Sequence, residues 1–303
     1  MSKINPVIEQ AIIGERESWV ALTIAQQNRI YDMFVNAENA ILAKISRYSK
    51  GGKIPTYRLD ALLTEIKKEM NALRPRIRGA VRQTQRKSID EGMKSAMRGA
   101  IASGVSDNSS KIGTSFVDKE GNIQRHNPKK SSYSASAWAG INADAMEAMM
   151  RFEFGGTTFS RRVWDATYTS EKAIRDRVNL AVLTGESAEK VSRDIRKYLG
   201  VSDTIRGKEL ANFHPGAGVY KSAYKNSLRV ASTELNRAFN EGMVRYAMKK
   251  KFIKGFIWRT GSGNPCPDCL DVEGNYYPKN EAPMLPLHPW CYCWLYTVYD
   301  EKL

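Results

Sequence analysis

The four cysteines of this chain all lie between residues 266 and 293, at spacings typical of a metal-binding site. Cys266 and Cys269 form a Cys-x-x-Cys turn, which can place two thiolates on one edge of a coordination tetrahedron. After 18 intervening residues comes His288, followed by Cys291 and Cys293, whose side chains share a face if this segment is extended. These five residues are the candidate ligands. Either the four cysteines bind the metal with His288 as a neighbour, or His288 replaces one of them.

Two other interpretations of the cysteines are disulfide bonds and reduced thiols in a small core. Disulfides are disfavoured because the N-terminal stretch lacks the apolar core and cleavage site of a secretion signal, so a cytosolic product is expected. Four thiols and a histidine within 28 residues are also too many for chance packing. The pattern therefore predicts bound zinc. Thiolate or imidazole at every ligand position indicates a structural site, because a catalytic zinc keeps one position open.

Apolar residues recur at offsets of three and four over most of the chain, the pattern of amphipathic helices. An aromatic stripe on the last helix is expected to be core. Gly185 and Ser187 indicate a helix stop followed by a helix N-cap. No apolar run approaches the ~18 residues that a membrane span needs. The predicted helices are 5–50, 59–101, 141–152, 170–183, 188–199 and 219–250, and the predicted strands, rich in aromatic and β-branched residues, are 252–258 and 291–299.

These elements predict an α+β fold class that is mostly α-helical. Residues 1–101 are expected to form an extended, basic helical arm. Residues 102–137, rich in Ser, Gly, Asn and Lys, are expected to be a flexible linker with a short hairpin. Residues 138–303 are expected to form a helical C-terminal domain, which ends in a small zinc-stabilised β module at 252–299.

The positive charge of the chain is concentrated in one region. Residues 41–130 contain 20 Lys and Arg against 8 Asp and Glu, a net +12 out of +15 for the whole chain. Such a segment attracts phosphate backbones through counterion release. The alternatives are a solvated basic helix face or contact with an acidic protein surface. The residues predicted to contact nucleic acid or a portal protein are Arg74, Arg76, Arg78, Arg82, Arg86 and Lys87.

Two motifs occur in a fixed order near the C-terminus. On the long helix, an Arg is followed by Thr-Glu and then Asn, at Arg229, Thr233, Glu234 and Asn236. The cysteine pattern comes next, with Trp258-Arg259-Thr260 before Cys266-x-x-Cys269, and Pro286-x-His288-Pro289-x-Cys291-x-Cys293 after it. Together they resemble the minor head proteins of tailed bacteriophages, the head morphogenesis family that includes the F protein of phage Mu. The resemblance covers about residues 138–299 and departs at Tyr292, where the family often has Arg.

The resemblance implies a minor capsid protein, present in few copies in the virion, inside the capsid near the portal vertex and in the host cytoplasm during assembly. It implies the portal protein and the major capsid or scaffolding protein as partners, with phage DNA as a possible further one, and roles in head assembly, DNA packaging or DNA delivery. We expect no enzymatic activity. The four residues on the long helix are expected to form a buried hydrogen-bonded cluster that holds the helix against the zinc module. A surface ion pair of Glu234 is the alternative.

Two other functional classes fit part of the sequence. A zinc-dependent nuclease would combine basic charge with a Cys/His module, but no paired carboxylates accompany an open metal position, and His214 is the one free histidine that could act as a base. A DNA-binding zinc ribbon would need basic residues between the cysteine pairs. That segment instead has Lys279 against Asp271, Glu273 and Glu281.

Overall fold

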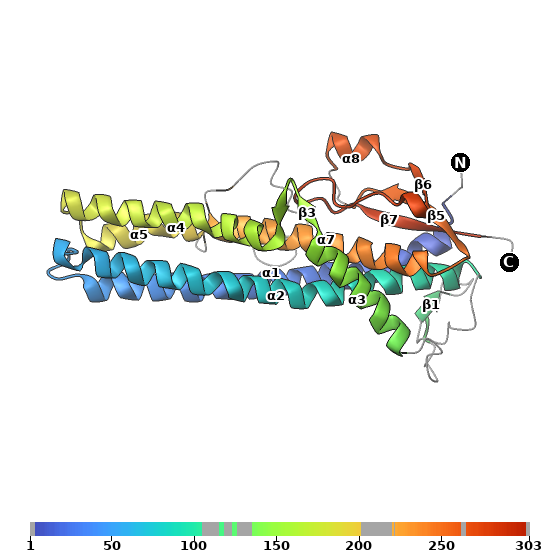
Figure 1. Ribbon diagram of the computed structural model, residues 1–303, viewed down its shortest axis with the longest axis horizontal. Helices are drawn as coiled ribbons and strands as arrows, with labels where there is room; N and C mark the ends of the chain where they lie inside the picture. Colours follow the sequence, from blue (N-terminus) through green and yellow to red (C-terminus); the bar gives the residue numbers. More distant parts are fainter. Residues whose placement is uncertain are drawn as a thin grey trace. The chain divides into compact units, whose positions relative to one another are not determined.

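The computed structural model describes residues 4–104, 115–117, 123–125, 135–200, 220, 222–261 and 265–300. Within this part of the chain the predicted fold class, α+β and mostly helical, is confirmed. Long helices dominate the chain up to Met248, and a small antiparallel sheet follows them near the cysteines (Figure 1). None of the described helices combines the length and the apolar character that crossing a bilayer would require.

The helices overlap all the predicted ones, but those predicted at 141–152 and 170–183 begin earlier, at residues 135 and 159. The helices are α1 (Pro6–Tyr48), α2 (Leu59–Ala102), α3 (Ala135–Arg151), α4 (Phe159–Thr184), α5 (Ala188–Leu199), α7 (Ala223–Met248) and the short α8 (Pro267–Asp271), with 3-10 turns at Thr56–Arg58 and Lys279–Glu281. The strands are β1 (Ser115–Val117), β2 (Ile123–Arg125), β3 (Glu153–Phe154), β4 (Thr157–Thr158), β5 (Ile253–Arg259), β6 (Tyr276–Pro278) and β7 (Trp294–Tyr299).

The chain divides into two compact units, each built from segments that are distant in sequence. The first unit contains residues 1–23, 84–151 and 233–303, and the second contains residues 24–83 and 152–232. This grouping differs from the division predicted at 101/102 and 137/138. Composition shows where charge and apolar content change along a chain, but it does not show which helices pack together. The helices α1, α2 and α7 each contribute residues to both units.

In the first unit, the beginning of α1 packs against α7 and against the segment that carries the last two cysteines. Trp19 is fully buried, and its ring centroid lies 5.8 Å from those of Phe239 and Tyr292. The indole N–H of Trp19 donates a hydrogen bond of 3.2 Å to the carbonyl of Leu235. The aromatic stripe predicted on the long helix therefore belongs to the core, as the buried Phe239 and Tyr246 show.

The first unit also holds a three-stranded antiparallel sheet of order β6-β5-β7. Phe256, in the central strand, is paired with Tyr277 of β6 and Thr297 of β7. The strand predicted at 291–299 begins only at Trp294, so that the cysteine-bearing residues 291–293 form the approach to β7. The hairpin predicted within 102–137 is present as β1 and β2, and the rest of that predicted linker, apart from 102–104 and 135–137, lies outside the described residues.

In the second unit, α4 and α5 form the helical hairpin that the sequence predicts (Figure 1). Gly185 ends α4 in the left-handed conformation, with φ of 68°. The Ser187 hydroxyl then caps α5 by accepting a hydrogen bond from the backbone N–H of Lys190. Arg177 of α4 forms ion pairs with Glu186 and with Asp194 of α5, which ties the two helices together.

Candidate metal centre

The first half of the cysteine cluster is the first turn of α8. Cys266 is the N-cap residue of this short helix, and Pro267 follows at a position where its missing N–H is not needed. The N–H groups of Cys269 and Leu270 donate hydrogen bonds of 3.1 and 3.0 Å to the carbonyl of Cys266. The turn therefore holds the two thiols on the same side of the backbone, as the Cys-x-x-Cys spacing predicts.

The second half of the cluster folds back onto this turn. The Nε2 atom of His288 lies 3.1 Å from the sulfur of Cys266 and 3.2 Å from that of Cys269. The sulfurs of Cys269 and Cys291 are 3.8 Å apart, close to the ~3.8 Å expected for two sulfurs at 2.3 Å from a tetrahedral zinc. Cys266, Cys269 and His288 form one group of mutually close ligand atoms, and Cys269, Cys291 and Cys293 form another. All five predicted residues thus meet around Cys269, and this Cys/His cluster could hold a metal ion.

The tautomer of His288 suits metal binding. Its Nδ1 atom lies 2.8 Å from the carbonyl oxygen of Pro289, which accepts a hydrogen bond from a protonated Nδ1. That hydrogen bond leaves the lone pair of Nε2 pointing toward the two sulfurs of the Cys-x-x-Cys turn. A hydrogen bond on the distal ring nitrogen is the usual way in which proteins orient a ligating imidazole.

The thiols influence one another strongly. A hydrogen bond from the Cys293 thiol lowers the pKa of Cys291 to about 5, and hydrogen bonds with the backbone of Cys293 and Leu287 act in the same direction, while burial opposes them. The same hydrogen bond raises the pKa of Cys293, and burial raises that of Cys269. One thiolate is therefore stable in the cluster without a cation. A bound metal ion would add the charge that deprotonates further thiols.

Trp290 shapes the turn that brings Cys291 back toward the helix, and the sequence did not single it out. It has a positive φ of 64°, an uncommon conformation for a bulky residue, and its side chain is 1% exposed. Its backbone N–H donates a hydrogen bond of 3.2 Å to the hydroxyl of Thr233 on α7. The N–H of Cys291 then bonds to the carbonyl of His288 at 3.2 Å, which closes the turn.

The four motif residues of α7 differ in their surroundings. Thr233 and Asn236 contact residues 290–293, called the metal segment from here on. Asn236 does so by donating hydrogen bonds to the carbonyls of Cys291 and Cys293. Glu234 is buried, so it is not a surface residue, and it accepts a hydrogen bond of 3.2 Å from Gln85. Arg229 belongs to the second unit and is half-buried, and burial lowers its pKa.

No protein-family model, curated protein or solved structure matches this chain. The resemblance to the head morphogenesis family therefore depends on the two motifs themselves. In the structure, two residues of the first motif, Thr233 and Asn236, bond directly to the segment that carries the end of the second.

Arg16 is a further residue of this site that the sequence analysis missed. It lies on α1, and its guanidinium donates a hydrogen bond through Nη2 to the carbonyl of Tyr292. Burial lowers the pKa of Arg16 to about 10, and the neighbouring groups Cys293, Cys291 and Tyr292 oppose this shift. No local sequence pattern shows that this arginine will meet a segment 276 residues away.

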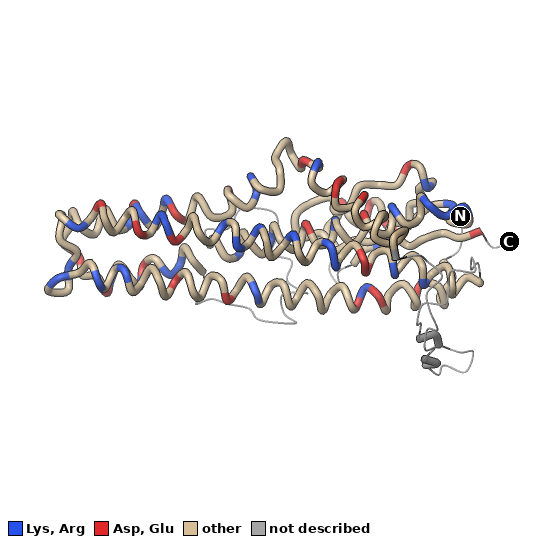
Figure 2. Tube along the Cα trace, turned by 60° about the horizontal axis from the view of Figure 1, so that its bottom comes forward, with Lys and Arg blue, Asp and Glu red and all other residues tan. Residues whose placement is uncertain are grey.

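Five of the six residues predicted to contact a polyanion are exposed on α2, namely Arg76, Arg78, Arg82, Arg86 and Lys87. Arg74 is different. Its guanidinium donates hydrogen bonds to Thr167 and to Glu171 of α4, with which it forms an ion pair whose carboxylate is 4% exposed. Figure 2 shows acidic residues interspersed among the basic ones along the helices, so charge is locally more mixed than the net value suggests.

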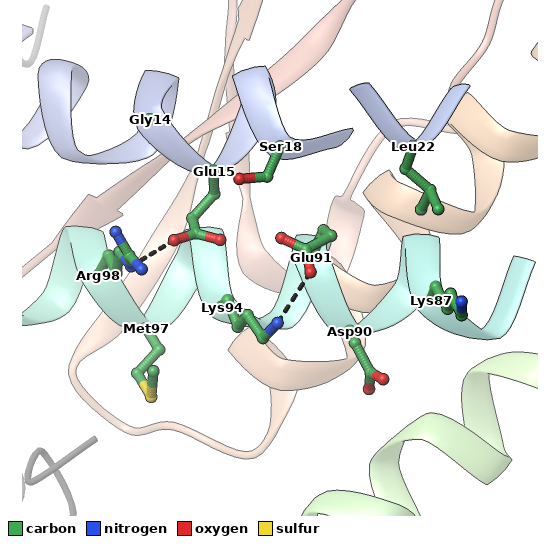
Figure 3. Close-up of a pocket in the computed structure, with 10 residues that line it drawn as sticks. All are labelled: Gly14, Glu15, Ser18, Leu22, Lys87, Asp90, Glu91, Lys94, Met97 and Arg98. Atoms are coloured by element: carbon green, nitrogen blue, oxygen red, sulfur yellow. Dashed lines mark hydrogen bonds and ion pairs between the residues drawn. The ribbon is translucent and has the colours of Figure 1, made fainter. Parts of the chain in front are cut away.

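A cavity of about 610 Å³ lies between α1 and α2 in the first unit (Figure 3). Glu15, Glu91 and Lys94 face one another across it, and Glu15 forms an ion pair with Arg98. Glu15 is 3% exposed, and burial together with a hydrogen bond to Glu91 raises its pKa to about 7. Of the predicted contact residues, Lys87 also lines this cavity.

Proposed function

We propose that the chain binds one zinc ion in its Cys/His cluster and that this zinc is structural. The observation that carries the proposal is that two groups of mutually close ligand atoms, Cys266 with Cys269 and His288, and Cys269 with Cys291 and Cys293, share Cys269. Thiolate and imidazole ligands favour zinc over magnesium or calcium, which prefer oxygen. Four such ligands fill the coordination shell and leave no open position for a substrate, which favours a structural role over hydrolysis.

The test is the zinc content of the purified protein, measured by mass spectrometry on wild type, Cys266→Ser and Cys269→Ser. About one zinc per wild-type chain is expected, with loss of zinc and of protease resistance at the C-terminus in both variants. Asp268→Asn is the matched control, because this exposed carboxylate lies between the two cysteines of the turn. Metal-free wild-type protein with oxidised thiols would contradict the proposal.

We further propose that the protein is a minor head protein of a tailed bacteriophage, associated with the portal vertex. The support is the joining of the two family-like motifs in one structural unit, where Thr233 and Asn236 of α7 bond to the Trp290–Cys293 segment. A zinc-stabilised module suits a protein that must stay folded through head assembly. The exposed basic residues of α2 suit a setting that contains DNA and acidic protein surfaces.

This second proposal is tested on particles and on the purified chain. Heads purified from the phage that encodes the chain should contain it in few copies, and it should co-purify with the portal protein when the two are co-expressed. Incubation of the zinc-loaded chain with DNA should yield no cleavage. Absence of the chain from purified heads would contradict the proposal, and DNA cleavage that is lost in Cys269→Ser would favour the nuclease alternative.

A further inference from the structure

Arg16 of α1 is packed against the metal segment through the carbonyl of Tyr292. The side chain is buried, with 8% of its surface exposed. Its guanidinium lies 5.0 Å from the ring centroid of Trp19 and 5.8 Å from that of Trp294, so aromatic rings confine it. The hydrogen bond from Nη2 goes to the carbonyl of Tyr292, the residue between two candidate ligands. The position of the charge relative to the cysteines is therefore fixed by packing.

Within the described part of the chain, the charge of Arg16 has no carboxylate to balance it. Among the described residues, no Asp or Glu forms an ion pair with this guanidinium, and its Nη1 atom is buried without a hydrogen-bond partner. The neighbouring residue Glu15 is paired with Arg98 instead. A buried charge without a partner strongly destabilises the folded state. The fold therefore needs negative charge close to Arg16, and the ionisable groups that act on this guanidinium are Cys293, Cys291 and Tyr292.

The charge of a zinc-thiolate centre matches this requirement. Zinc with three thiolates and a neutral imidazole has a net charge of −1, and zinc with four thiolates has a net charge of −2. One arginine neutralises the first arrangement and halves the charge of the second. A zinc site whose ligands were all neutral would keep the positive charge of the ion and would repel the same guanidinium.

We infer that Arg16 is the counter-ion of the metal centre: it balances the excess negative charge of the zinc-thiolate cluster, raises the affinity for the metal and links the beginning of α1 to the cluster. This inference rests on the proposed zinc site. It assigns a metal-binding role to a residue on α1, far in sequence from every ligand.

Gly261 leaves the space that the guanidinium of Arg16 occupies beside the metal segment. Gly261 follows β5, and a Cβ at this position would overlap both the Arg16 guanidinium and the carbonyl of Tyr292. Any other residue would displace the charge from the cysteine segment. The close approach of these three groups explains why glycine occupies this position.

The experiment compares the zinc affinity of wild type, Arg16→Gln and Arg16→Lys by competition with a chromophoric chelator. Arg16→Gln keeps a donor for the Tyr292 carbonyl but removes the charge, and it should weaken zinc binding by about 10- to 100-fold, as loss of an outer-sphere partner of a metal site typically does. Arg16→Lys keeps the charge and should weaken binding less. Arg29→Gln, an exposed arginine of the same helix, is the control and should bind zinc as wild type does.

The melting temperature of each variant, measured with and without zinc, distinguishes a counter-ion role of Arg16 from a role in packing alone. Loss of packing alone would lower both values equally, whereas loss of the counter-ion should shrink the increase that zinc produces. The cobalt-substituted forms should also differ, because the thiolate-to-cobalt absorption bands respond to charge beside the sulfurs. Zinc affinity and cobalt bands of Arg16→Gln that equal those of wild type would overturn the inference while leaving the zinc site intact.

A measurement on wild type needs no variant to fold. Hydrogen exchange of residues 8–23 of α1 should slow when zinc is added to the metal-free chain, because the metal centre then holds the guanidinium of this helix. The α5 segment Ala188–Leu199, in the second unit, serves as the control and should not respond. If zinc binds and hydrogen exchange in α1 is unchanged, the counter-ion inference is contradicted but the proposed zinc site is not. Absence of zinc binding by wild type would overturn both it and the proposed site.

Discussion

The side-chain amide of Asn236 donates hydrogen bonds to two backbone carbonyls of the metal segment, to that of Cys291 at 2.8 Å and to that of Cys293 at 3.0 Å. Both acceptors are buried, and Asn236 itself is fully buried on α7. A single side chain thus satisfies the backbone on either side of Tyr292. The approach to β7 depends on this amide, because residues 291–293 are not paired in the sheet.

Asn236→Ala should therefore lower both stability and metal affinity. Two buried carbonyls would lose their main donor, which should reduce the free energy of unfolding by on the order of 2–4 kcal/mol. Denaturant unfolding of the zinc-loaded protein and chelator competition measure the two effects. Asn226→Ala is the matched control, since this buried amide bonds to the backbone of Tyr220 in the second unit. Asn226→Ala should lose stability and keep its zinc affinity. A loss of zinc affinity in this control would contradict a specific role of Asn236 at the metal segment.

Gly92 of α2 and Gly242 of α7 allow these two helices to touch. A Cβ at Gly92 would overlap the carbonyl of Phe239, and a Cβ at Gly242 would overlap that of Ile89. Gly92→Ala and Gly242→Ala should each lower the free energy of unfolding by about 1–3 kcal/mol through overpacking. Gly79→Ala, in open space on α2, should instead raise it by about 0.5–1 kcal/mol through helix propensity. Thermal unfolding of the three variants tests the contrast, and equal shifts in all of them would refute it.

Local features of this fold were predictable from the sequence, because they depend on residues close together along the chain. The 3.6-residue period locates α1, α2 and α7, and the residues Gly185 and Ser187 locate the α4–α5 turn. The spacing of the cysteines and His288 identifies the residues that meet, since a turn and a return strand suffice to bring them together.

The rest depends on tertiary packing. Arg74 stands in the same basic run as Arg76 and Arg78, but only Arg74 lies on the face that meets Glu171 of α4. Arg16 is similarly indistinguishable from a surface arginine until its helix is placed against the segment around Tyr292. The division into two compact units could not be predicted either, because α1, α2 and α7 each contribute one part to the first unit and another part to the second.

Glu15 should make stability depend on pH. Its pKa in the folded chain is about 7, raised from an ordinary value of 4.5 chiefly by burial, then by the hydrogen bond with Glu91, while Arg98 opposes the shift. The folded state thus binds a proton more tightly than the unfolded state. The resulting stability is fully present below pH 4.5 and is lost as pH rises through about 7, by at most about 3 kcal/mol.

Glu15→Gln should remove this slope, whatever it does to the absolute stability through loss of the Arg98 ion pair. Denaturant unfolding between pH 5 and pH 8 should show a shallower dependence on pH in Glu15→Gln than in wild type. Glu17→Gln is the control, since this exposed neighbour on α1 should leave the slope unchanged. Identical slopes in wild type and Glu15→Gln would show that another group titrates in this range.

The exposed arginines of α2 should account for part of any DNA affinity. Arg78, Arg82 and Arg86 are exposed, and no described acidic side chain pairs with them. Replacing all three with Gln should weaken binding to duplex DNA at low salt. If each contacts a phosphate, the slope of log affinity against log salt concentration should also fall by up to about 3.

The control replaces three other exposed arginines, so that net charge changes equally. Arg151, Arg161 and Arg196 are exposed and are already paired with Glu147, Asp165 and Glu38. Their replacement by Gln should change the salt slope little, because paired charges attract fewer phosphates. Fluorescence anisotropy with a labelled duplex at several salt concentrations measures both sets. Equal losses in the two triple variants would mean that net charge, and not the α2 surface, governs binding.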